Sequence, residues 1–401
     1  MGTTKIKKAK RFYQRRVIID RIMLIVALVT IIISAIIGLR GESRERVKYL
    51  PGLLPDSCIY EELENNIYRC YMPVTFTTIA YVSSQEGKGF SGPLKVAVLV
   101  DTTGKLIDLD IILNRETPSY FNKVTRSGFI LAFKGMRYAD LAVEDNSPDV
   151  ITGATYTCSG IKEAVTRAVS VVASSQLGES VYEETKPSVK FGIPEISLII
   201  LYLMVLFALK RKEGLKKVLR WIILLAGLVI LGLWFSIPLS LGKINMLLLG
   251  YWPDWHTNLY WYMLIFSVFG ITLVNDKRWY CNWICPFLAV QEGLAFIGGG
   301  KVRISLKARY WFRLLQRVLV WVAIVMAFLY RTPSKFNYEL FGAFFNLTAT
   351  IILFFLLAIF LIASLFIKRP YCNILCPINA LNDLITEIRK GVLYLADKIR
   401  S

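Results

Sequence analysis

The stretch Arg278-Trp-Tyr-Cys-Asn-Trp-Ile-Cys-Pro286 recurs further along the chain as Arg369-Pro-Tyr-Cys-Asn-Ile-Leu-Cys-Pro377. Each copy follows a pair of apolar segments, so the two pairs run in the same direction as parallel repeats. Proline disfavours helical geometry at the residue before it, and each motif therefore predicts a helix end at its second cysteine. The recurrence predicts a helical architecture with one motif at the end of each repeat.

The cysteines of these motifs are candidate metal ligands. Residues four apart lie on one face of a helix, so each motif can present two sulfurs together. The four candidates are Cys281, Cys285, Cys372 and Cys376. Four cysteine ligands suit an iron–sulfur cluster or a structural zinc ion. Structural or regulatory thiols are a further interpretation, whereas a disulfide is disfavoured in a reducing cytoplasm.

The composition indicates a membrane protein. Hydrophobic residues make up 55% of the 401 residues, above the roughly 45–50% of soluble proteins. Windows near the ~20 residues that cross a bilayer as a helix lie at 17–39, 193–209, 218–237, 258–274, 311–330 and 345–367. We therefore predict an α-helical multi-pass membrane protein with six transmembrane helices.

The distribution of the net charge of +19 predicts the orientation. With a cytoplasmic N-terminus, segments 1–16, 210–220, 277–313 and 368–401 are inside and hold 7, 6, 7 and 6 Lys plus Arg. The outer loops 238–257 and 331–344 together hold 3. This asymmetry follows the positive-inside rule and predicts a cytoplasmic-membrane protein in contact with lipid, with no nucleic-acid partner.

The same spans divide the chain into five parts. They are a basic cytoplasmic tail (1–16), a retained transmembrane anchor helix (17–39), an extracytoplasmic domain (40–190), five transmembrane helices (191–367) and a cytoplasmic segment (368–401). The last segment contains the second cysteine motif and an amphipathic stretch. That stretch suits a helix on the inner membrane surface or one packed on the protein itself.

The extracytoplasmic domain shows strand and helix patterns. Leu94, Val96, Val98 and Val100 alternate as in a half-buried strand, and a second strand-like run at 105–113 follows a Thr-Thr-Gly turn. Apolar residues of segment 159–174 recur at helical spacing. We predict an α+β domain.

Just before this helix lies Asp149-Val-Ile-Thr-Gly-Ala-Thr155. Small neighbours leave the Thr155 hydroxyl accessible, and a helix N-terminus favours a phosphate group. A plain turn that starts a helix is the alternative interpretation.

These residues resemble the flavinylation motif of FMN-binding domains found in sodium-pumping NADH:quinone reductase, Rnf complexes and NosR-like membrane proteins. The matching positions are Asp149, Thr152, Gly153, Ala154 and Thr155, with Glu116, Thr117 and the hairpin after Gly92 as further points of likeness. The resemblance implies FMN bound through a phosphoester to Thr155, with Asp149 assisting a flavin transferase.

Over nearly the whole chain the layout resembles the NosR/NirI membrane family. NosR carries a ferredoxin-like domain after the second motif, whereas this sequence continues for some 25 residues after Cys376, so such a domain is not expected here. The shorter layout is similar to the PceC/RdhC-like members, which are encoded beside reductive dehalogenases. The resemblance implies a membrane-bound flavoprotein that transfers electrons, with menaquinol as the donor, toward an extracytoplasmic reductive dehalogenase or its membrane anchor in organohalide respiration. The alternative is a regulatory or maturation factor for that reductase.

Four other features leave alternatives open. Cys58 and Cys70 form a disulfide or remain unpaired. His256, the only histidine, lies among aromatic residues that suit a quinol pocket or interfacial anchors. Glu195 and Glu292 lie near span ends and are expected to be solvated, with proton relays as the alternative.

Overall fold

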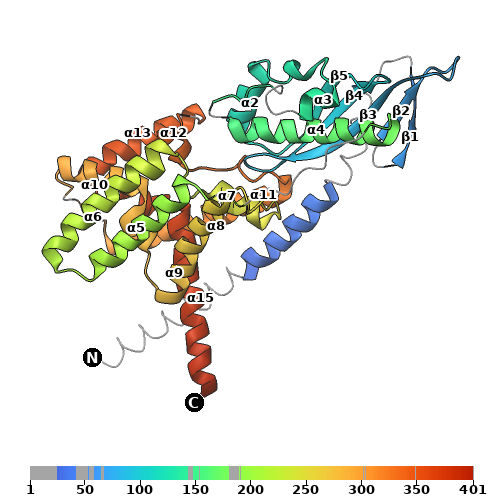
Figure 1. Ribbon diagram of the computed structural model, residues 1–401. Helices are drawn as coiled ribbons and strands as arrows, with labels where there is room; N and C mark the ends of the chain where they lie inside the picture. Colours follow the sequence, from blue (N-terminus) through green and yellow to red (C-terminus); the bar gives the residue numbers. More distant parts are fainter. Residues whose placement is uncertain are drawn as a thin grey trace, which may run out of the picture.

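The computed structural model describes residues 25–41, 53, 58–64, 67–142, 148–152, 154–179, 189, 191–300, 302, 304–347 and 349–400. Within these ranges the chain forms a sheet domain (58–179) and a helical part (25–41 and 191–400), shown in Figure 1. The basic tail 1–16 and residues 17–24 of the predicted anchor lie outside the described residues.

The sheet domain contains five antiparallel strands in chain order. They are β1 (Ile59–Glu62), β2 (Ile67–Tyr71), β3 (Thr78–Lys88), β4 (Pro93–Asp101) and β5 (Leu106–Asn114). The predicted hairpin is confirmed as β4 and β5, and its turn is held by Asp101, whose carboxylate accepts backbone N–H bonds from Thr103 and Lys105. Strand β4 is not half-buried, because Leu99 on its second face is also buried, against Ala80 and Val82 of β3.

Helix α4 (Thr155–Gln176) covers one face of this sheet and confirms the predicted helical segment. Two glycines allow the contact, because a Cβ at Gly87 would lie 1.9 Å from the carbonyl oxygen of Gly160. The apolar face of α4 forms the domain core with alternate residues of β4. Short helices α2 (Pro118–Arg126), η3 (Leu131–Phe133) and α3 (Tyr138–Ala142) complete the predicted α+β fold.

The helical part begins with a helix at Ile25–Gly41. Its first repeat contains α6 (Glu213–Gly227), η5 (Leu228–Trp234), α8 (Leu259–Ile265), η6 (Phe266–Gly270), α9 (Ile271–Asn275), η7 (Tyr280–Ile284) and α10 (Pro286–Ile297). Its second repeat contains α11 (Leu306–Tyr330), α13 (Ile351–Phe366), α14 (Pro370–Ile374) and α15 (Pro377–Arg400). Helices α5 (Ile193–Leu209), α7 (Leu241–Leu248) and α12 (Phe341–Phe345) complete this part. Both repeats thus consist of two apolar helices, a short turn with the first cysteine, and a helix that starts at the motif proline.

The predicted count of six spans is not confirmed. In the described part of the chain, two helices are long and apolar enough to cross a membrane, at Glu213–Trp234 and Lys307–Tyr330. These are the first helices of the two repeats. The other predicted spans correspond to apolar helices of 17 residues or fewer.

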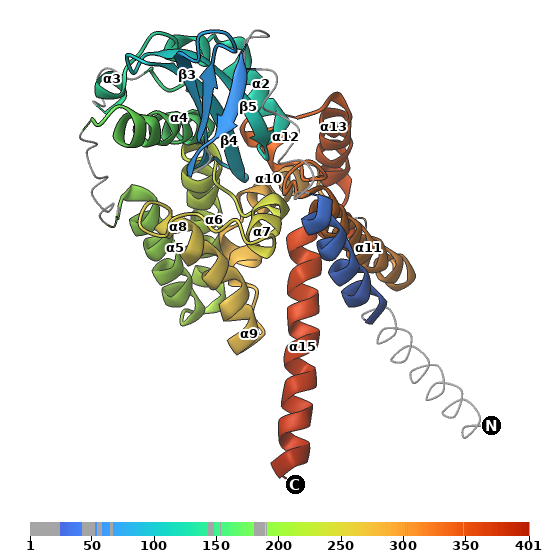
Figure 2. The ribbon, with the colours of Figure 1, turned by 90° about the vertical axis from the view of Figure 1, so that its right-hand side faces the viewer.

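The sheet domain and the C-terminal end lie at opposite ends of the molecule, as Figure 2 shows from a second side. Helix α15 contacts α11 and α9 with its N-terminal half, and its C-terminal part extends away from the other helices, with Ile388 and Val392 exposed (Figure 2). Its apolar face is therefore not packed on the protein at these positions. The pairing that the sequence left open is a disulfide, between Cys58 and Cys70 at the edge of the sheet.

Candidate flavin and iron–sulfur sites

Thr155 is the first residue of α4, and its side chain is exposed. The first N–H groups of a helix lack partners inside it and carry a partial positive charge, which suits a phosphate group. The ammonium of Lys123 donates a hydrogen bond of 2.7 Å to the Thr152 carbonyl and adds positive charge beside the same loop. Thr155 therefore combines an accessible hydroxyl with a setting that fits a phosphoester.

The other motif residues surround this position. Ala154 is buried, Asp149 is exposed, and Gly153 lies outside the described residues. The next turn of α4 carries Thr157, whose hydroxyl donates to the Glu116 carboxylate at 3.2 Å. The structure thus brings Glu116 to the start of α4, although it lies 39 positions before Thr155 in the sequence.

Glu116 is buried and faces a lysine of the helical part. The Ser91 backbone N–H donates to its carboxylate at 3.2 Å, and burial raises the pKa of Glu116 to about 7. The ammonium of Lys243, on α7, lies over the rings of Phe90 and Trp261 and donates to the Phe90 carbonyl. Desolvation lowers the pKa of Lys243 to about 7, although the nearby Glu116 opposes this shift.

Thr117 joins the sheet domain to the helical part. Its hydroxyl shares a hydrogen bond of 2.7 Å with Ser91 and donates one of 2.9 Å to Ser334. Nearby, the Asn346 amide donates to the Tyr120 hydroxyl at 3.1 Å. These contacts place the region around Thr155 against the helical part.

The cysteine motifs break their helices, as predicted, but they do not use a single helix face. Cys281 lies in the π-helical turn η7, whereas Cys285 is non-helical, with φ −55° and ψ 121°. Cys372 lies in α14, and Cys376 precedes α15. The prolines thus do more than end a helix: because their fixed φ suits a first helical position, Pro286 and Pro377 each begin the next helix. The prediction of an inner loop over 277–313 accordingly missed α10.

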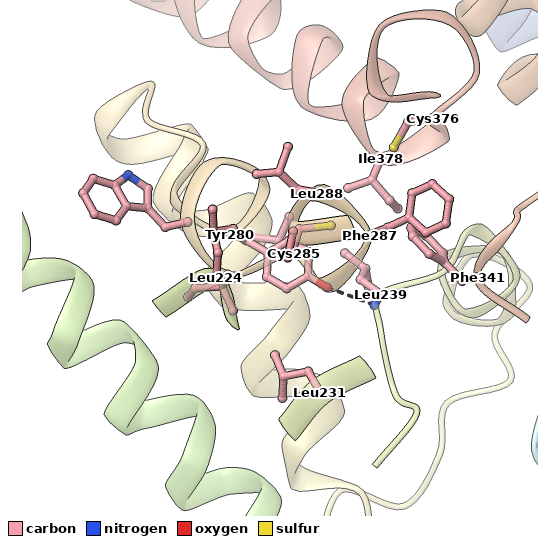
Figure 3. Packing of buried hydrophobic residues seen from close by; sticks show 14 of the residues in the cluster. Leu224, Leu231, Leu239, Tyr280, Cys285, Phe287, Leu288, Phe341, Cys376 and Ile378 are labelled. Carbon is pink, nitrogen blue, oxygen red and sulfur yellow. Dashed lines mark hydrogen bonds between the residues drawn. The ribbon is translucent and has the colours of Figure 1, made fainter. Parts of the chain in front are cut away.

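The four cysteines gather in one region. Cys285 and Cys376 are buried in a single apolar cluster (Figure 3). Cys281 and Cys372 pack against this cluster. The thiols also lie within electrostatic reach of one another. Among the described residues no three Cys, His, Asp or Glu side chains converge closely enough for one metal ion. Four cysteine sulfurs, two from each repeat, suit the ligand set of an iron–sulfur cluster.

This region reaches toward the sheet domain. The Tyr280 hydroxyl accepts a hydrogen bond of 3.4 Å from the Leu239 N–H, drawn in Figure 3. Leu239 precedes Lys243 by four residues, a span of at most about 14 Å, and Lys243 contacts Phe90 of the sheet domain. A chain of contacts therefore links the region of Cys285 to Phe90 of the sheet domain.

Comparison with known proteins supports both cofactors. Residues 89–170 match the FMN-binding domain family. Residues 257–305 and 348–395 each match the 4Fe-4S binding domain family and contain one cysteine motif each. The chain therefore combines flavin-binding and iron–sulfur sequence signatures, and the iron–sulfur interpretation is favoured over zinc or unligated thiols.

Two curated proteins are similar to the flavin region. A component of the proton-translocating ferredoxin:NAD(+) oxidoreductase complex of Clostridium ljungdahlii is 33% identical over 102 residues, which are 24% of this chain and 55% of that protein. A component of the ion-translocating oxidoreductase complex of Stutzerimonas stutzeri is 30% identical over 108 residues, 25% of this chain and 47% of that protein. The chain thus spans about half the length of these relatives, whose likeness bears out the predicted resemblance to Rnf flavin domains.

The other residues that the sequence singled out, His256, Glu195 and Glu292, each make defined contacts in the structure. His256 pairs with Asp254 at 2.8 Å beside the exposed Trp255, which suits an interfacial position. The prediction that Glu195 and Glu292 are solvated is wrong. Buried Glu195 accepts the Tyr260 and Gly192 N–H groups, and Glu292 forms ion pairs with two arginines.

Sequence reasoning missed several polar residues at both sites. Ser91 and Lys243 belong to no recognisable sequence motif, and they lie near Glu116 only because of the fold. Gln291 and Asn382 each contact a cysteine sulfur. The sequence did contain a sign of this second pair: Gln291 and Asn382 occupy equivalent positions after the two cysteine motifs, and both carry a side-chain amide.

Proposed function

We propose that this chain is a membrane-bound flavoprotein that transfers electrons between FMN at Thr155 and an iron–sulfur cluster held by its four motif cysteines. The observation that carries the proposal is the presence, in one chain, of a flavin-binding match and a repeated 4Fe-4S match whose cysteines gather in one buried region. FMN supplies one- and two-electron chemistry, and an iron–sulfur cluster supplies one-electron chemistry.

In the flavin half, Thr155 holds the phosphate as an ester. Asp149, Thr152, Gly153 and Ala154 form the sequence that a flavin transferase uses, by resemblance to the flavinylation motif. Glu116 and Lys243 then provide a buried acid and a half-buried base in reach of this region, which suits proton movement linked to flavin chemistry. Thr117 keeps the domain docked on the helical part.

In the cluster half, Cys281, Cys285, Cys372 and Cys376 are the ligands. Each motif supplies two of them, so a single cluster needs both repeats. Cys285 and Cys376 lie in a buried apolar cluster, and the hydrophobic shell around a metal site limits the access of solvent.

We place the chain in the cytoplasmic membrane as a multi-pass protein with a cytoplasmic N-terminus and six spans. The asymmetry of Lys and Arg supports this orientation, and the apolar helices at all six expected positions support the count. The sheet domain is then extracytoplasmic, within residues 40–190.

For partners, we propose menaquinol as the electron donor and a reductive dehalogenase or its membrane anchor as the acceptor. The support is the resemblance of the whole layout to PceC/RdhC-like proteins. The relatives of the flavin region are described as parts of oxidoreductase complexes, which favours action within a complex.

Reduction by a quinol tests this function. Anaerobically purified protein is mixed with a menaquinol analogue, and flavin absorbance is recorded against quinol potential. We expect bleaching of the flavin band in the wild-type protein. No flavin reduction at any quinol potential would favour the regulatory or maturation role instead.

A further inference from the structure

The two repeats exchange contacts around the cysteines. The side-chain amide of Gln291, in the first repeat, donates to the sulfur of Cys372, in the second, at 3.2 Å. The amide of Asn382, in the second repeat, donates to the sulfur of Cys281, in the first, at 3.5 Å. Both amides are fully buried, and they occupy equivalent positions in α10 and α15.

The next residue after each amide, Glu292 or Asp383, also contacts the opposite repeat. Glu292 forms an ion pair with Arg369 of the second repeat, and Asp383 forms one with Arg278 of the first. Each acid also faces an arginine from the first helix of its own repeat. Arg220 of α6 lies 2.8 Å from Glu292, and Arg313 of α11 lies 4.0 Å from Asp383.

We propose that Gln291 and Asn382 are positioning residues that donate N–H···S hydrogen bonds to the cluster ligand of the opposite repeat and raise the reduction potential of the cluster. This inference rests on the proposed function, because it requires a cluster on these cysteines. The crossed ion pairs fix the two repeats so that each amide reaches the other repeat's sulfur.

The expected direction follows from electrostatics. Reduction adds negative charge to a cluster and its sulfurs, and a hydrogen-bond donor stabilises the more negative state. Both amides are fully buried, where a hydrogen-bond donor has a larger effect than in water. Removing one donor must therefore lower the potential.

Asn382 gives the cleaner variant, because its amide nitrogen bonds to Cys281 and its buried oxygen has no partner among the described residues. Gln291 also accepts the Tyr371 N–H at 2.9 Å, so its loss disturbs the backbone as well. Asn382→Leu thus removes the donor without stranding another group. Thr386→Val is the matched control, since Thr386 is a buried polar residue on the same face of α15 without a sulfur contact.

The test is an anaerobic redox titration of the full chain by EPR, with iron, sulfide and flavin measured in the same samples. We expect N382L to retain iron and to shift the reduction equilibrium of the cluster about tenfold toward oxidation, or about 59 mV for one electron. The flavin potential and T386V should be unchanged. Loss of iron in N382L that Asn382→Gln restores also supports the donor role.

Two results overturn the inference: a cluster potential in N382L equal to that of T386V, or iron loss that N382Q does not restore. Wild-type protein without iron and sulfide would instead contradict the proposed function, so the two failures are distinguishable.

Discussion

Thr155 carries the most specific chemical assignment, because a phosphoester needs its hydroxyl. Thr155→Val keeps the shape of the side chain and removes the oxygen. We expect covalent flavin to be absent from this variant, measured as flavin fluorescence of the denatured protein on a gel. Thr102→Val, at an exposed threonine of the same domain, should keep its flavin. Flavin that stays covalently bound to T155V would refute the assignment.

Glu116 predicts a pH dependence of stability. Its pKa is raised from 4.5 to about 7 by burial, so its contribution to stability is complete below pH 4.5 and is lost as pH rises through about 7. Glu116→Gln has no such titration. We therefore expect the melting temperature of the full chain in detergent to fall with pH, relative to that of E116Q, over this window.

The comparison is best made below about pH 6.5, because Lys243 faces Glu116 and its own pKa is also about 7. A difference between the two proteins that does not change with pH would show that Glu116 is not buried in its protonated form.

At the level of elements, the helix α6 touches a cysteine motif through a glycine. A Cβ at Gly227 would lie 2.3 Å from the carbonyl oxygen of Ile284, the residue before Cys285. Gly227→Ala must therefore push η7 away, which we expect to lower the free energy of unfolding by about 1–3 kcal/mol. We expect less iron per protein and a lower melting temperature.

Gly214, in the same helix, provides the control, because a Cβ there meets nothing within 4 Å. Gly214→Ala should keep the iron content and melting temperature of the wild type. Equal iron in G227A and wild type would contradict the close packing of α6 on η7.

The elements that the sequence predicted correctly are those with strong local patterns. Alternation marked β4 and helical spacing marked α4, whereas β1 and β2 carry polar residues and are ordered by pairing with their neighbours. Helix α10 was missed because Pro286 was interpreted as a stop, although proline equally suits the first position of a new helix.

At the candidate sites, the motifs identified Thr155 and the four cysteines, because their spacing is local. Lys243, Ser334 and the crossed amides come from distant segments. The sequence shows that Gln291 and Asn382 occupy equivalent positions. It does not show that each amide contacts a cysteine of the opposite repeat, because this depends on how α10 and α15 approach the opposite motif.

For the whole molecule, the sheet domain docks on α7 and on the 331–346 segment. Tyr338 lies in this segment; burial raises its pKa, and the nearby Glu339 and Cys376 add to the rise. The segment thus lies near Cys376, a proposed cluster ligand, while Ser334 of the same segment bonds to Thr117. On this arrangement, we expect the proposed electron transfer between flavin and cluster to take place within one chain.

The rate of that exchange is the most direct test of the account. Full-length protein carrying both cofactors receives one electron by a photoreduction pulse, and flavin absorbance and the cluster's EPR signal are followed at several protein concentrations. We predict that the electron redistributes between the two centres at a rate independent of protein concentration. A rate proportional to concentration, or a cluster that never exchanges with the flavin, would contradict electron transfer within the chain.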